Sequence, residues 1–126
     1  HGDLRPEHIC FTEPLVIFDC LEFSRTLRII DPFDEIAFLD MECSFLGATW
    51  VGPIVRRRVA ELLDGDISDE LYCFYAAFRA LMRARMALGH LYFGSSTDVD
   101  KWQMKTDRYA RLAADFADQA LAKRSP

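Results

Sequence analysis

The stretch that decides the fold opens the chain, as His1-Gly2-Asp3-Leu4-Arg5-Pro6-Glu7-His8-Ile9. Two further segments follow it in order, namely Asp19-Cys20-Leu21-Glu22-Phe23 and Asp31-Pro32-Phe33-Asp34-Glu35-Ile36-Ala37. Residues 8–12 and 15–19 predict two short strands joined at Glu13-Pro14. The second strand is apolar and β-branched, so we expect it to be the buried one. This order predicts a loop that carries Asp3, followed by a hairpin whose second strand ends at Asp19.

Everything after residue 31 is expected to be helical. Asp31 suits an N-cap and Pro32 suits the first turn of a helix. Apolar periodicity predicts helices over residues 33–46, 50–63 and 69–93, and a last one ending near residue 122. The fold class is therefore α+β and mostly α, with a short N-terminal β-hairpin followed by about four packed helices in residues 31–124. We expect one domain that covers residues 1–126.

Two helices have distinctive apolar patterns. In residues 33–46 the apolar side chains lie on nearly every face, which indicates a central helix. In residues 69–93 large apolar side chains recur three, four and seven residues apart, which predicts the core-facing side of that helix. They are Leu71, Phe74, Tyr75, Phe78, Leu81, Met82 and Met86.

Composition excludes several classes of protein. Of the 126 residues 51% are apolar, which excludes a disordered chain. No run approaches the roughly 18 uncharged apolar residues of a membrane span, and no charged-then-apolar leader is visible. The cysteines form no C-x-x-C pair, so we expect free thiols in the reducing cytoplasm. They are Cys10, Cys20, Cys43 and Cys73.

Negative charge is concentrated in the first part of the chain. Residues 1–47 contain ten acidic residues and three arginines, a balance of −7 within a net charge of −5. The remainder therefore carries +2. An acidic surface suits divalent metal ions and cationic substrates, and it argues against nucleic acid as a partner.

The three quoted segments resemble the C-terminal lobe of aminoglycoside phosphotransferase-like kinases, a branch of the protein-kinase-like superfamily. In that family the loop begins His-Gly-Asp, the later motif reads Ile-Asp-x-x, and the next helix opens Asp-Pro-x-x-Asp-Leu-Ala. The resemblance covers this lobe only. It implies a kinase-like fold for the lobe and ATP-dependent transfer of a phosphoryl group to an alcohol.

The resemblance also implies roles for individual residues. Asp3 matches the catalytic base, which takes the proton of the acceptor hydroxyl, and Arg5 matches a cation that contacts the transferring phosphoryl group. Asp19 matches the aspartate that holds Mg²⁺. A carboxylate directly after an apolar strand needs a partner on physical grounds alone, which Mg²⁺ or an arginine could supply. A salt bridge from Asp19 to Arg5 or Arg25 is the structural alternative.

His8 departs from the family's pattern, which has Asn at this position to help hold a second metal ion. Imidazole can ligate a metal, although Mg²⁺ prefers oxygen ligands, so His8 is either a metal ligand or a hydrogen-bonded structural residue. Three other residues are expected to act indirectly. They are Glu22 near the metal, His1 as a support of the loop, and Asp34 as a structural tie to the helix.

The resemblance implies that the elements that bind ATP lie outside the segment it covers. Relatives hold Mg²⁺-ATP between two lobes, using a glycine-rich loop and a strand lysine that precede the catalytic loop. This chain begins at that loop, so we expect the 126 residues alone to be inactive and to use Mg²⁺ and ATP only with an N-terminal lobe supplied. The acceptor is expected to be a small-molecule alcohol, and acidic residues in the helical part suit a cationic one.

Two other functions stay open. The chain could be a non-catalytic helical binding module of kinase ancestry that forms a homodimer through apolar residues at the lobe surface. These residues are Leu4, Ile9, Phe11, Phe18 and Phe23. Alternatively, His8 could form a transition-metal site with Asp3 and Asp19. Dependence on Mg²⁺ separates a catalytic lobe from a binding module, since only the lobe should bind this ion through Asp19.

Overall fold

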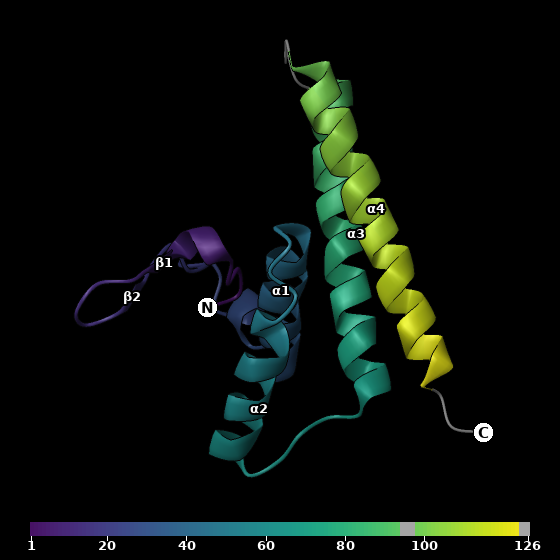
Figure 1. Ribbon diagram of the computed structural model, residues 1–126. Coiled ribbons are helices and arrows are strands. Elements are labelled where there is room, and N and C mark those ends of the chain that lie inside the picture. Colours follow the sequence, from purple (N-terminus) through teal and green to yellow (C-terminus); the bar gives the residue numbers. More distant parts are fainter. Residues whose placement is uncertain (94–97, 124–126) are drawn as a thin grey trace. The chain divides into compact units, whose positions relative to one another are not determined.

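The computed structural model describes residues 1–93 and 98–123, and most of them are helical (Figure 1). The predicted class, α+β and mostly α with an N-terminal hairpin and then helices, is confirmed. The elements are the 3-10 turn Pro6–His8, β1 (Ile9–Cys10), β2 (Val16–Ile17), the 3-10 turn Thr26–Arg28, α1 (Pro32–Phe45), α2 (Val51–Leu63), α3 (Asp69–Phe93) and α4 (Val99–Ala122). No helix within the described residues is both long enough and apolar enough to cross a membrane.

The chain divides into two compact units, His1–Ile67 and Ser68–Pro126. The first unit contains the hairpin, α1 and α2, and the second contains α3 and α4. The single domain expected over residues 1–126 therefore stays a prediction. All residues that the sequence singled out for chemistry lie in the first unit.

The hairpin is shorter and more exposed than its sequence predicts. β1 and β2 pair antiparallel, with Ile9 opposite Ile17 and Cys10 opposite Val16. The expectation that the second strand is buried is wrong, because Val16 is 46% exposed and Ile17 is 48% exposed. A sheet of two strands has no neighbouring strand to cover its edges, and apolar character alone cannot say what packs on its faces.

Helix α1 begins as predicted. The side chain of Asp31 accepts a hydrogen bond from the backbone N–H of Phe33 at 2.8 Å, and Pro32 occupies the first turn. Ten of its residues are buried, so α1 is the central helix that its apolar pattern indicated. Three of the buried residues carry carboxylates, Glu35, Asp40 and Glu42.

Helices α1 and α2 pack closely at one glycine. A Cβ atom added to Gly52, in the first turn of α2, would lie 1.9 Å from Cγ of Asp40 on α1. The carboxylate of Asp40 thus lies against the start of α2, where the helix dipole favours a negative charge. Only glycine leaves room for this arrangement.

Helices α3 and α4 lie side by side in the second unit (Figure 1). The ring of His90 on α3 stacks on Trp102 of α4 with ring centroids 3.9 Å apart. The guanidinium of Arg83 lies over the ring of Tyr109, 5.5 Å from its centroid. The buried positions of α3 are mostly small: Tyr72, Cys73, Ala76, Ala80, Ala84 and Ala87. The large apolar side chains expected to face the core are instead largely exposed.

We expect Gly52→Ala to destabilise the fold, because its methyl group would overlap the short side chain of Asp40. Overpacking of this kind costs about 1–3 kcal/mol, measurable by urea denaturation. Gly89→Ala is the matched control, since a Cβ at that helical position meets nothing within 4 Å. Equal losses in the two variants would contradict the explanation.

Candidate functional site

The loop that carries Asp3 is fixed to α1 by one buried carboxylate. Glu35 accepts a hydrogen bond from the N–H of Gly2 at 2.6 Å through Oε2, and from the N–H of Leu4 at 2.8 Å through Oε1. Gly2 has φ of +87°, and a Cβ there would lie 2.8 Å from Cδ1 of Leu21. The turn therefore requires glycine at residue 2, and it presents the two neighbouring amides to Glu35.

These hydrogen bonds come from Glu35, the residue after Asp34, which is the predicted tie between loop and helix. The structural role of Asp34 stays a prediction. The signal was present in the quoted motif. In Asp-Pro-x-x-Asp the second acidic residue stands three positions after the proline, which is residue 35 here. Glu35 was not among the residues expected to act at the site, although it lies in that motif.

His8 joins the loop to the end of the hairpin. Its ring is buried, and Nδ1 lies 2.8 Å from the backbone oxygen of Asp3. Because a carbonyl oxygen can only accept, Nδ1 carries a proton. Nε2 lies 2.9 Å from Nη2 of Arg5 and 3.3 Å from Oδ2 of Asp19. In the neutral ring Nε2 is thus an acceptor for Arg5, and both ring nitrogens are engaged by the protein.

Arg5 lies among acidic groups. Its Nε donates to Oδ2 of Asp3 at 3.1 Å, and its Nη1 donates to Oε1 of Glu7 at 2.5 Å. The two residues predicted to be catalytic, Asp3 and Arg5, are therefore direct partners. Glu7 was absent from the sequence-based site, although its place two residues after Arg5 in the same loop was a usable signal.

Asp19 follows β2 in an unusual backbone conformation. Its φ is +61°, in the left-handed region that few residues other than glycine and asparagine or aspartate adopt. The preceding residue is held on both sides, since Phe18 N–H donates to the oxygen of His8 at 3.0 Å and Nε2 of His1 lies 2.7 Å from the oxygen of Phe18. His1 thus contacts the residue before Asp19, and its supporting role stays a prediction. The Asp19 side chain is 68% exposed.

Three carboxylates line one hollow beside the loop. The hollow has a volume of about 680 Å³, and Asp3, Asp19 and Glu22 contribute its acidic groups. Its other lining residues are Phe18, Cys20, Leu21 and Phe23. The structure therefore brings Glu22 to the same hollow as the predicted base and the predicted metal ligand.

The donor chemistry of the hollow fits Mg²⁺ better than a transition metal. Mg²⁺ takes one or two protein carboxylates and completes its shell with water and phosphate oxygens. In the part of the chain that the structure describes, no group of three or more His, Cys, Asp or Glu side chains is arranged to hold a metal ion. A site made of Asp3, His8 and Asp19 together would need such a group, and both nitrogens of His8 are already engaged.

The four cysteines are free thiols with different access to solvent. Cys10 is exposed, Cys20 is half-buried, and Cys43 and Cys73 are buried. Burial raises the pKa of the Cys43 thiol, and the negative charges of Asp40 and Glu42 raise it further. Cys43 therefore holds its proton to a higher pH in the folded chain than in the unfolded chain.

Comparison with known proteins gives relatives but no function. No family model and no solved structure matches the chain. Uncharacterized proteins from Mycobacterium bovis and from two strains of Mycobacterium tuberculosis are each 36% identical to it over 88 residues. The match covers 68% of this chain and 18% of each relative. The chain thus spans less than a fifth of the length of these relatives.

Glu35→Gln should loosen the loop, because the amide of glutamine offers one acceptor oxygen where two N–H groups need one each. Leaving one of them unpaired costs about 1–3 kcal/mol. We expect faster hydrogen exchange at the Leu4 amide, measured by NMR, together with lower stability. Asp34→Asn is the comparison. A larger loss of stability in Asp34→Asn than in Glu35→Gln would indicate that Asp34, not Glu35, ties the loop to the helix.

The raised pKa of Cys43 predicts a loss of stability at alkaline pH. The contribution is fully present below the thiol's unfolded pKa, near pH 8.5–9, and is lost as pH rises through the folded pKa. We expect Cys43→Ala to show a shallower decline in the free energy of unfolding between about pH 8 and 10 than the parent chain. Cys10→Ala, at an exposed position, should leave that decline unchanged, and equal slopes in both variants would refute the assignment.

Proposed function

We propose that this chain forms part of the C-terminal lobe of an ATP-dependent small-molecule phosphotransferase of the aminoglycoside phosphotransferase-like kind. Asp3 is the catalytic base and Asp19 is the ligand of Mg²⁺. The observation that best supports this is the position of His8. Its Nδ1 binds the backbone oxygen of Asp3, and its Nε2 lies 3.3 Å from Oδ2 of Asp19, so the loop of Asp3 and the end of β2 meet at one buried side chain.

The residues of the loop have separate roles in the proposed phosphoryl transfer. The partly exposed carboxylate of Asp3 accepts a hydrogen bond from the acceptor hydroxyl and takes its proton as the phosphoryl group arrives. Arg5 orients that carboxylate through its Nε. Its Nη1 is paired with Glu7, and this exposed pair can be exchanged for a phosphoryl oxygen. His8 holds the loop in the place of the family's Asn.

Mg²⁺ would be held by Asp19, with Glu22 nearby in the same hollow, and when bound it neutralises charge on the phosphates. His8 is the weaker candidate ligand, because its Nε2 accepts from Arg5. The carboxylate of Asp19 is 68% exposed and can therefore reach a metal ion. The excess of acidic groups in the first unit attracts the divalent cation.

The chain alone is proposed to be inactive. Neither a glycine-rich phosphate loop nor a strand lysine of the kinase type occurs in the 126 residues, so ATP requires an N-terminal lobe. The greater length of the mycobacterial relatives is compatible with such a lobe. The acceptor is a small-molecule alcohol, with a cationic one favoured by the acidic surface, and the cytoplasm is the compartment in which ATP is available. We propose neither nucleic acid nor a membrane as a partner.

One observation favours the second candidate, a non-catalytic binding module of kinase ancestry. An apolar groove of about 620 Å³ runs between the hairpin, α1 and α2. Leu4, Ile9 and Phe11, three residues expected at the homodimer surface, line it. Phe23 lies outside this groove and is 81% exposed. A homodimer through this surface remains the prediction of the second candidate.

NMR titration with Mn²⁺ separates the two functions, because Mn²⁺ substitutes for Mg²⁺ at Asp19 and broadens nearby resonances. We expect broadening at Asp3, Asp19 and Glu22 in the parent chain and its loss in Asp19→Ala. Glu13→Ala, which removes an exposed carboxylate from the hairpin, is the matched control and should behave as the parent. Broadening that persists in Asp19→Ala would remove the support for a metal ligand at this residue.

A further inference from the structure

Helix α3 carries an exposed row of large apolar side chains, here named the α3 stripe. It consists of Leu71, Phe74, Phe78, Leu81 and Met82, with exposed fractions between 37% and 60%. Residues 71, 74, 78, 81 and 85 are spaced alternately by three and four, the spacing with which a helix packs lengthwise on another helix. A contiguous apolar surface of this kind marks an interaction site.

The α3 stripe differs from the buried side of the same helix. The buried residues of α3 are mainly alanines, with Ala76, Ala80, Ala84 and Ala87 almost fully covered. Small side chains therefore occupy the covered positions, while the bulky ones point to solvent. A helix that is apolar on both sides is typical of one that is covered on both.

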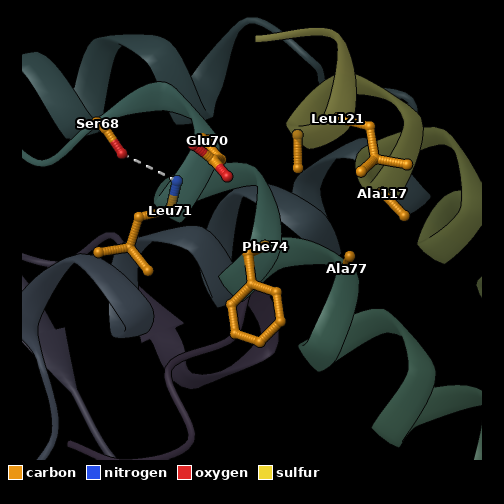
Figure 2. Close-up of a pocket in the computed structure, with 8 residues that line it drawn as sticks. Ser68, Glu70, Leu71, Phe74, Ala77, Ala117 and Leu121 are labelled. Atoms are coloured by element: carbon orange, nitrogen blue, oxygen red, sulfur yellow. Dashed lines mark hydrogen bonds between the residues drawn. The ribbon is translucent and has the colours of Figure 1, made fainter. Parts of the chain in front are cut away.

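Charges at the two ends of the α3 stripe restrict what can cover it. Glu70 precedes Leu71 and lines, with Leu71 and Phe74, a hollow of about 440 Å³ at the start of α3 (Figure 2). Arg85 continues the row seven residues after Phe78. Among the described residues neither Glu70 nor Arg85 has an ion-pair partner. One end of the stripe thus offers a negative charge and the other a positive charge.

We propose that the α3 stripe binds the α3 stripe of a second copy of this chain, with the two helices antiparallel about a twofold axis at Phe78. Glu70 and Arg85 lie eight and seven residues from Phe78, so this register brings Glu70 of each copy to Arg85 of the other. Phe78 then meets Phe78, and Phe74 meets Leu81. The result is an apolar centre flanked by two equivalent ion pairs, as a self-complementary interface requires.

The charges also exclude a parallel arrangement of the two α3 helices. In a parallel pair Arg85 would face Arg85 and Glu70 would face Glu70, and like charges at an interface oppose association. The paired segments, residues 70–85, extend over roughly 24 Å at about 1.5 Å per residue. Such an interface is near or below the lower limit of about 1,200 Å² for stable complexes. The dimer is therefore weak and depends on concentration. It requires no part of the proposed phosphotransferase site.

Sedimentation equilibrium of the full 126-residue chain over about 1–300 μM tests the proposal, with circular dichroism as the check of folding. We expect a monomer–dimer equilibrium whose Kd rises at least about tenfold in Arg85→Glu and in Glu70→Arg. Combining both substitutions should restore association to near the parent value, because the two charges are exchanged. Phe78→Gln should also weaken the dimer, since it removes the apolar contact on the axis.

Arg111→Glu is the matched control, because it makes the same change of charge at an exposed position of α4 and should leave the Kd unchanged. A parent chain that stays monomeric at every concentration would overturn the proposal and leave the α3 stripe as a surface for another protein. A dimer that Arg85→Glu does not weaken would place the contact elsewhere, for example at the hairpin. A double variant that fails to recover would reject the antiparallel register.

Discussion

The candidate site depends on the pair of hydrogen bonds that Glu35 accepts from Gly2 and Leu4. Backbone amides in a turn have no helical or sheet partner, and leaving them buried and unpaired is costly. Glu35 satisfies both with one carboxylate, and Asp3 stands between the two amides that it holds. The direction of Asp3 is thereby fixed relative to α1. Arg5 and His8 both bind Asp3, so their positions follow from the same constraint.

In the proposed kinase family, Asn stands where this chain has His8, and the two side chains would bind the loop differently. An imidazole with its proton on Nδ1 has a donor and an acceptor on opposite sides of the ring, so His8 can bind the Asp3 oxygen and Arg5 together. The acceptor nitrogen, Nε2, is therefore not available to bind a metal ion. In the proposed kinase, this shifts metal binding from a shared set of ligands to the exposed carboxylate of Asp19.

Local signals in the sequence were sufficient to predict the helices but not the tertiary contacts around them. The cap at Asp31 and the apolar pattern of α1 were predicted correctly because both depend on residues within one or two turns. The burial of β2 was predicted wrongly because it depends on residues distant in sequence. No periodicity relates a loop to a strand end, so the sequence pattern alone did not predict that Asp3, Asp19 and Glu22 line one hollow.

Helix α3 shows why apolar periodicity identifies a face without identifying its partner. Its large side chains gave the stronger pattern and were expected to face the core, yet the buried residues are mostly alanines. Two packed helices can approach closely where their side chains are small, and the bulky residues then lie on another side. That leaves an apolar surface in the second unit, while the chemistry proposed for Asp3 and Asp19 belongs to the first. Because the two functions use separate residues, substitutions at Arg85 and at Asp19 can distinguish association from metal binding within one chain.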